Sequence, residues 1–171
     1  MAQTLDNQLF QLNVQGTVNN LLDWQLASAP MTYPYSYQLV SGTGANQADR
    51  LFADTRTIAA SGTDPLDVSG VLVDAIGTTL LFARIKGMIV RAAPGNTNNV
   101  LVGGAGSNQF ATWLSAATTN IIVRPGGIFT LFAPDATAYA VTAGTGDILQ
   151  IANSGAGTSV NYDVILIGSS A

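Results

Sequence analysis

The sequence predicts an all-β fold, an antiparallel β-sandwich of jelly-roll-like type that follows an N-terminal arm. The 171-residue chain contains no Glu and a single Lys, two residue types that helix surfaces favour, whereas Val, Ile, Thr, Gly and Asn are abundant. Apolar and polar residues alternate in short segments, which clusters of Gly, Asn and Pro separate at the spacing typical of a sandwich or barrel. An open barrel is the second architecture that fits these patterns.

The first forty residues differ in composition from the rest of the chain. They are rich in Asn and Gln up to Gln25 and then contain an aromatic and proline-containing run over 30–37. A chain of 171 residues has the length of a single domain. We therefore expect residues 1–42 to form an N-terminal arm or extension and residues 43–171 to form the sandwich domain.

Three tyrosines of this arm form a stripe. Tyr33, Tyr35 and Tyr37 are two residues apart, so an extended backbone places them on one face. Pro34, on the opposite face, cannot donate to a strand ladder and indicates an edge. The stripe is either packed into the core or is a protein or glycan interface, and we take the three tyrosines as interface candidates.

Strand-like segments follow one another to the C-terminus. Between them lie turn sequences such as Asp64-Pro65, Pro94-Gly95, Pro125-Gly126 and Pro134-Asp135, which fix or permit the dihedral angles of a chain reversal. The segment 107–114 is the one stretch with helical spacing, and we expect a single turn there. The predicted strands are 35–40, 51–59, 66–73, 79–91, 99–103, 120–124, 127–133, 138–142, 147–152 and 159–168.

The predicted strand 79–91 separates two faces by its period of two. One face has Leu81, Ala83, Ile85 and Ile89 and is expected to face the core, and the other has Phe82, Arg84, Lys86 and Met88. Arg84 and Lys86 would then project from the outer face of the sheet. They either extend their charged ends into solvent or form a docking strip for an acidic partner or a neighbouring subunit, which makes them interface candidates.

The composition also limits the chemistry that this chain can perform. Without His or Cys, it lacks imidazole bases, thiolate nucleophiles and the usual zinc, haem and iron–sulfur ligands. The spacing of Asp64, Asp67 and Asp74 does not match a calcium loop, and the glycine clusters do not match a phosphate-binding loop. We therefore expect no enzyme activity, no catalytic residues, no cofactor and no metal site.

Charge and hydropathy narrow the range of partners. The net charge is −4 and the pI is about 4.3, which argues against nucleic acid as a partner. The longest apolar stretch, 80–90, is too short for a bilayer and contains two cations, so we expect no membrane span. The first residues lack the features of a secretory signal, and we expect synthesis in the cytoplasm.

Eight segments of the chain have a shared pattern of turns and strands, namely 42–49, 54–60, 66–77, 82–86, 102–105, 123–127, 133–135 and 139–141. They resemble motifs of small structural proteins encoded by tailed bacteriophages and prophages. The resemblance covers about three quarters of the chain, and residues from Met1 to about Val40 match least.

The resemblance implies a capsid-associated protein, most simply a decoration or cement protein of jelly-roll type on the capsid surface of the virion. The partners it implies are the major capsid protein and further copies of this chain, as a homotrimer or homodimer. A phage tail or baseplate component, with glycans as one candidate ligand, is the alternative.

Overall fold

Strands account for all regular structure in the described part of the chain. The structure is a computed structural model that describes residues 5, 6 and 8–171, and these residues form fourteen strands and no helix. The all-β prediction is therefore confirmed. The strands are β1 (Gln8–Leu21), β2 (Leu26–Ser41), β3 (Gln47–Ala48), β4 (Arg50–Ile58), β5 (Thr63–Asp67), β6 (Ser69–Val73), β7 (Thr79–Leu81), β8 (Arg84–Ala92), β9 (Val100–Gly103), β10 (Asn120–Val123), β11 (Ile128–Phe132), β12 (Tyr139–Ala140), β13 (Ile148–Asn153) and β14 (Val160–Ser169).

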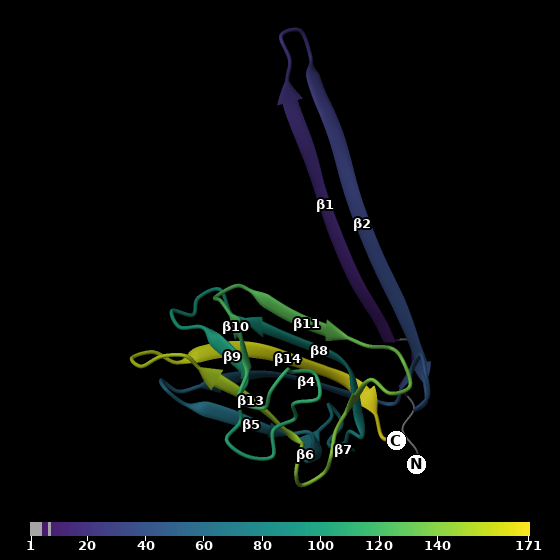
Figure 1. Cartoon of the computed structure of the whole chain (residues 1–171), viewed down its shortest axis with the longest axis vertical. Coiled ribbons are helices and arrows are strands. Elements are labelled where there is room, and N and C mark those ends of the chain that lie inside the picture. Colours follow the sequence, from purple (N-terminus) through teal and green to yellow (C-terminus); the bar gives the residue numbers. More distant parts are fainter. Residues whose placement is uncertain (1–4, 7) are drawn as a thin grey trace.

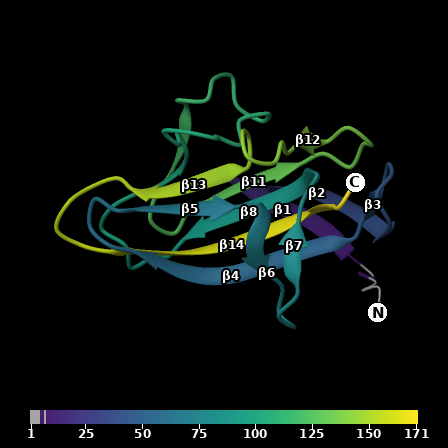
Figure 2. The same ribbon diagram turned by 90° about the horizontal axis from the view of Figure 1, so that it is seen from below.

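Two antiparallel sheets form the body of the molecule (Figures 1 and 2). One has the strand order β10-β9-β13-β5, and the other has the order β11-β8-β14-β4, with the short β12 added to β8. Both sheets contribute to one cluster of buried apolar side chains, for example Leu149 and Ile151 from β13 and Val164 and Leu166 from β14. Two sheets that enclose a common core define a β-sandwich. The jelly-roll connectivity stays a prediction.

The predicted strand 66–73 is wrong, because the chain changes sheets within it. Residues up to Asp67 belong to β5, whereas β6 pairs with β7 in a separate small hairpin. The carboxylate of Asp67 accepts a hydrogen bond from the amide of Ser69 at 2.9 Å, which forms the local turn. Asp64-Pro65 was also predicted as a turn, yet Pro65 lies inside β5, where an edge strand tolerates a missing amide donor.

The predicted strand 79–91 is likewise interrupted, and its two faces are not those expected. β7 ends at Leu81, which is exposed, and β8 begins at Arg84. Against β14, Gly87 lies opposite Ile167 but Ile85 lies opposite Gly168, so Lys86 is an additional residue in β8. Such a β-bulge resets the alternation of side chains, which explains why Met88 is buried in the core rather than on the outer face.

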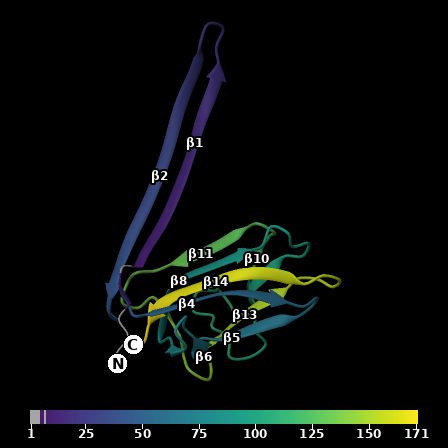
Figure 3. The ribbon, with the colours of Figure 1, turned by 180° about the vertical axis from the view of Figure 1, so that it is seen from behind.

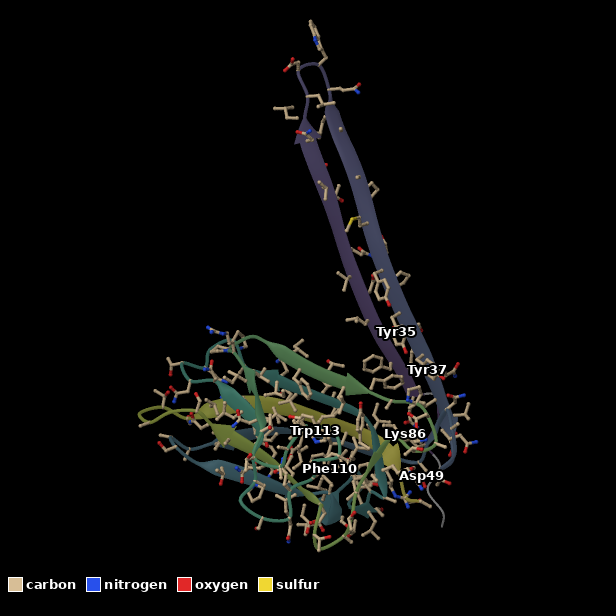
Figure 4. All side chains as sticks on the ribbon, viewed as in Figure 1. Tyr35, Tyr37, Asp49, Lys86, Phe110 and Trp113 are labelled. Atoms are coloured by element: carbon tan, nitrogen blue, oxygen red, sulfur yellow. The ribbon has the colours of Figure 1, made fainter. Side chains whose placement is uncertain are left out.

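The single turn expected in the segment 107–114 is a reverse turn over residues 111–114. The amide of Leu114 donates to the carbonyl of Ala111 at 2.9 Å, and the indole of Trp113 donates to the carbonyl of Phe110 at 2.9 Å. Phe110 is fully buried, and the ring of Trp113 lies 5.5 Å from that of Phe129 (Figure 4). The turn therefore closes over the sandwich core with its two aromatic residues.

Ahead of the sandwich, β1 and β2 form a long antiparallel hairpin that projects away from the two sheets (Figures 1 and 3). Only its last part, from Tyr35, was predicted as a strand, because the amide-rich sequence before it concealed the pattern. The proposed boundary between an arm of residues 1–42 and a sandwich of residues 43–171 stays a prediction. Residues 1–4 and 7 of that arm lie outside the described residues.

The close approach beside the bulge gives a stability prediction. A Cβ atom at Gly168 would lie 2.1 Å from the carbonyl oxygen of Arg84 and 2.7 Å from Cδ1 of Phe82. Gly168→Ala should therefore lower the free energy of unfolding, measured by urea denaturation, by about 3 kcal/mol. Gly16→Ala is the control, because no atom lies within 4 Å of that position, and it should change stability by less than about 1 kcal/mol. Equal stability of the two variants would contradict the prediction.

Candidate interaction surface

The register of the β1–β2 hairpin sorts its side chains onto two faces. Directly paired residues in an antiparallel ladder point to the same side, and here the pairs run from Gln8 opposite Leu39 to Leu21 opposite Leu26. One side, which we call the apolar face, consists of Phe10, Leu12, Val14, Gly16, Val18, Ala29, Met31, Tyr33, Tyr35 and Tyr37. The other side, the polar face, has Leu9 and Gln38 at its base and Leu21 and Leu26 at its tip, and between them consists of Gln11, Asn13, Gln15, Thr17, Asn19, Ser28, Pro30, Thr32, Pro34 and Ser36.

Most of the apolar face is exposed to solvent. Leu12, Val14, Val18, Met31 and Tyr33 are 50% to 64% exposed, although all are large apolar or aromatic side chains. Isolated exposed apolar residues are ordinary on soluble proteins, but a continuous stripe of them marks a contact surface.

The hairpin tip continues this apolar character. Leu21 and Leu26 close the paired part of the hairpin and are both exposed, and Trp24 in the loop is 98% exposed. Asp23 is the one charged residue between Gln8 and Ser41. Protein interfaces are enriched in aromatic residues and depleted of charge at their centres, and the hairpin has this composition.

The base of the apolar face packs against the sandwich. The ring of Phe10 stacks on Phe132 at the end of β11 with centroids 4.4 Å apart, and the ring of Tyr37 meets Phe132 edge-on at 5.4 Å. Leu39 is fully buried. Figure 4 shows Tyr35 and Tyr37 on the part of the hairpin nearest the sandwich. The apolar face is therefore anchored at its base and uncovered over the rest of its length.

The loop between β2 and β4 connects the hairpin to the sandwich by hydrogen bonds. The amide of Asn46 donates to the carbonyl of Pro134 at 2.7 Å, and the amide of Val40 donates to the carbonyl of Asn46 at 3.1 Å. The hydroxyl of Tyr37 donates to the side-chain carbonyl of Asn46. Asn46 has a φ of 60°, a left-handed conformation that Asn adopts more readily than most residues.

Lys86 does not belong to an exposed docking strip, so that prediction is wrong. Its side chain is 0% exposed, and its ammonium donates to the carbonyl of Gly44 in the same connecting loop (Figure 4). The β-bulge is the physical reason, because the additional residue of β8, Lys86, does not follow the alternation of side chains that the sequence suggested. Arg84, the other predicted residue of the strip, is half-buried.

Burial lowers the pKa of the Lys86 amine, and the positive charge of Arg84 lowers this pKa further. The negative charges of Asp135 and Asp49 raise it. The only lysine of the chain therefore fixes the connecting loop to the sandwich instead of facing a partner.

Part of this candidate surface was visible in the sequence. The structure places Tyr33, Tyr35 and Tyr37 on one face, with Tyr33 exposed and the other two half-buried. The sequence prediction missed the strand that pairs with them, β1, which contains Phe10, and the exposed Trp24 in the loop at the hairpin tip. The signal was present, because Phe10, Leu12, Val14 and Val18 alternate with polar residues as a half-buried strand does.

A second polar cluster joins the two sheets. Arg56 of β4 donates to both carboxylate oxygens of Asp64 in β5, at 2.6 and 3.1 Å, and the buried Tyr162 of β14 donates to Asp64 at 2.8 Å. The hydrogen bond to Asp64 raises the pKa of Arg56, and burial followed by the same carboxylate raises the pKa of Tyr162. Asp54 adds an outer contact to Arg56 at 3.0 Å. This geometry fits a structural tie between the sheets.

Within residues 5, 6 and 8–171, no three His, Cys, Asp or Glu side chains come together closely enough to hold a metal ion. The described part of the chain also contains no helix that is long and apolar enough to cross a membrane.

No protein-family model matches the chain. No curated protein and no solved structure is significantly similar to it. The resemblance to phage structural proteins therefore stays a prediction, and the functional proposal depends chiefly on the hairpin surface.

The tie between the sheets gives a second stability prediction. Asp64→Asn removes the charged acceptor shared by Arg56 and the buried Tyr162, and should lower the free energy of unfolding by about 2–3 kcal/mol. Asp54→Asn is the matched control. It alters the outer contact to Arg56 and keeps a side-chain oxygen that can accept from the amide of Thr55, and it should cost about 0.5 kcal/mol. Similar losses in the two variants, measured by chemical denaturation, would show that Asp64 does not hold the sheets together.

The buried amine gives a pH prediction. The pKa of Lys86 is lower in the folded state than in the unfolded state, so as the pH approaches 10.5 the unfolded state binds more protons than the folded state. The contribution of Lys86 to the free energy of unfolding therefore rises with pH. The free energy of unfolding of the wild type relative to Lys86→Met should therefore increase from about pH 8 to about pH 10. Tyr162 titrates in both proteins and cancels in this difference. A constant or decreasing difference would show that the amine is not desolvated by folding.

Proposed function

We propose that this protein is a non-enzymatic structural component of a bacteriophage virion. It binds the outside of the capsid as a decoration or cement protein and reinforces the shell. The observation that supports this proposal is the nearly uncharged hairpin, which holds an exposed apolar face away from a rigid sandwich. The motifs that resemble phage structural proteins supply the setting.

Binding to the capsid follows from the physical character of the apolar face. Covering Leu12, Val14, Val18, Met31 and Tyr33 with a partner removes apolar area from water, which is the main favourable contribution to most protein association. The aromatic side chains of Tyr33 and Trp24 supply large contact areas with few rotatable bonds. The partner we propose is the major capsid protein, through an apolar groove or sheet face of its own.

The scarcity of charge on the hairpin also determines how such binding depends on ionic strength. Charged interfaces weaken as salt screens them, but the hairpin has a single carboxylate, that of Asp23 at its tip. Attachment through the apolar face should therefore persist at high ionic strength. Reinforcement also requires a stiff protein, and the sandwich supplies this stiffness through its common core and the tie at Asp64.

A shortened hairpin tests whether the hairpin is needed for attachment to the capsid but not for folding of the sandwich. Replacing residues 13–34 by Asn-Gly joins Leu12 directly to Tyr35, which are paired in the register, through a two-residue turn. This variant keeps the stack of Phe10 on Phe132 and the buried Leu39, whereas removal of residues 1–42 would delete both. It should retain the β-type circular dichroism spectrum and cooperative melting of the full chain but fail to enter virions.

A matched pair of substitutions tests the face itself. Tyr33→Asp places a charge on the apolar face, and Thr32→Asp places the same charge on the polar face one residue away. When each is produced during phage growth, Tyr33→Asp should reduce incorporation into purified virions at least tenfold, whereas Thr32→Asp should enter at the wild-type level. Equal incorporation of the two would exclude the apolar face as the attachment surface.

The copy number of the protein distinguishes a capsid location from the alternative. Quantitative mass spectrometry of virions should give a copy number that scales with that of the major capsid protein. A copy number that matches tail or baseplate proteins, and a position on the tail in labelled particles, would support the alternative assignment instead.

A further inference from the structure

The two long edges of the hairpin differ in their capacity to accept another strand. In an antiparallel ladder, every second residue points its N–H and C=O groups away from its partner strand. Val40 and Gly42 donate their amides outside the hairpin, to Asn46 and Ala48. The N–H and C=O groups of even-numbered residues of β2 therefore point to the outer edge of β2. The odd-numbered residues of β1 that pair with them point their N–H and C=O groups to the outer edge of β1.

The outer edge of β2 is blocked by proline. Pro30 and Pro34 are even-numbered, so their ring nitrogens occupy positions from which an amide would otherwise donate outward. The part of this edge nearest the sandwich is already paired, because Val40 and Ser41 lie beside β3. Prolines on an edge strand are a known means of preventing the addition of a further strand.

The outer edge of β1 has no such protection. β1 is the terminal strand of its sheet and, within the described residues, pairs with β2 alone. Its fourteen residues contain no proline and no charged side chain. Long, uncharged and unblocked edges are templates for strand pairing. The outward-facing residues are Leu9, Gln11, Asn13, Gln15, Thr17, Asn19 and Leu21.

We propose that two copies of this chain associate through their β1 edges to form a four-stranded antiparallel sheet in the order β2-β1-β1-β2. The second copy fits this edge because the sequence of β1 is self-complementary about Gln15. With Gln15 opposite Gln15 of the partner, all the outward-facing residues are paired at once. Asn13 then lies opposite Thr17, Gln11 opposite Asn19, and the exposed Leu9 opposite the exposed Leu21.

This register also preserves the two faces of the hairpin. A two-fold axis normal to the sheet keeps each face on its own side, so Val14 of one copy lies beside Gly16 of the other, and Leu12 lies beside Val18. The amides and hydroxyls form a continuous row on the polar face, where they can donate to one another. No like charges meet, because β1 has none.

The dimer would enlarge the docking surface. A strand of fourteen residues spans about 48 Å, and four strands are about 19 Å wide, which gives the shared sheet a face of about 900 Å², including the part at each base that packs on Phe132. Since Phe132 contacts the apolar face of its own hairpin, both sandwiches would lie on that side, at opposite ends of the shared sheet.

Light scattering coupled to size exclusion tests the dimer with purified full-length protein. At micromolar concentration the wild type should have a mass of about 35 kDa, twice the 17.6 kDa of one chain. Gln15→Pro removes one outward donor from β1 and should reduce the mass to that of a monomer with an unchanged circular dichroism spectrum. Thr32→Pro is the matched control, because Thr32 pairs with Gln15 and faces the already blocked edge of β2, and it should remain dimeric.

A cysteine at the proposed axis tests the register without depending on the folding of a proline variant. The chain has no cysteine, so Gln15→Cys and Thr32→Cys each introduce a single thiol. In the proposed sheet, the two copies of residue 15 are about 5.5 Å apart and those of residue 32 are about 14 Å apart. A bismaleimide too short to span the longer separation should cross-link Gln15→Cys and leave Thr32→Cys as single chains.

Each outcome of these experiments is decisive for the edge pairing. A monomeric wild type, a trimer, a dimer that survives Gln15→Pro, or equal cross-linking of the two cysteine variants would overturn it. The result is separate from the proposed function. A dimer that does not enter virions would contradict only the capsid proposal, and a monomer that does enter them would contradict only the edge pairing.

Discussion

The register of one hairpin determines the surface that this protein presents. A ladder with a two-residue period places every other side chain on the same side, so a continuous pairing from Gln8 to Leu21 collects the apolar residues of two strands onto one face. A shift of β2 by one residue would place the tyrosines of β2 beside the amides of β1 and the apolar residues of β1 beside Ser, Thr and Pro of β2, so neither face would be continuously apolar. The apolar face, the blocked edge of β2 and the open edge of β1 all follow from this pairing.

The sandwich carries the hairpin through a small number of contacts at its base. An isolated two-stranded hairpin is marginally stable in water, and this one gains support from the stacking of Phe10 and Tyr37 on Phe132. The β-bulge in β8 adds a second fixation, since it directs the buried amine of Lys86 toward the carbonyl of Gly44. The irregularity of the sheet thus fixes the loop from which the hairpin rises.

Composition and turn chemistry were sufficient to predict the fold class and most strands after residue 99. Sequences such as Pro94-Gly95 and Pro125-Gly126 specify their turns locally, and the structure has turns there. The failures have non-local causes. The bulge at Lys86 depends on the register against Gly168, and the change of sheet after Asp67 depends on which strand Ser69 pairs with. For the site, the tyrosine stripe was visible in the sequence, whereas β1 was hidden by its amides and by Gly16.

The scarcity of charge in the N-terminal part has a consequence for resistance to digestion. The first Lys or Arg in the sequence is Arg50, so trypsin has no cleavage site in the hairpin, however accessible its backbone is. Proteases that cut after aromatic residues meet the opposite situation, because Trp24 and Tyr33 are exposed. The hairpin would therefore survive trypsin and be cut by chymotrypsin, unless a partner covers the aromatic side chains.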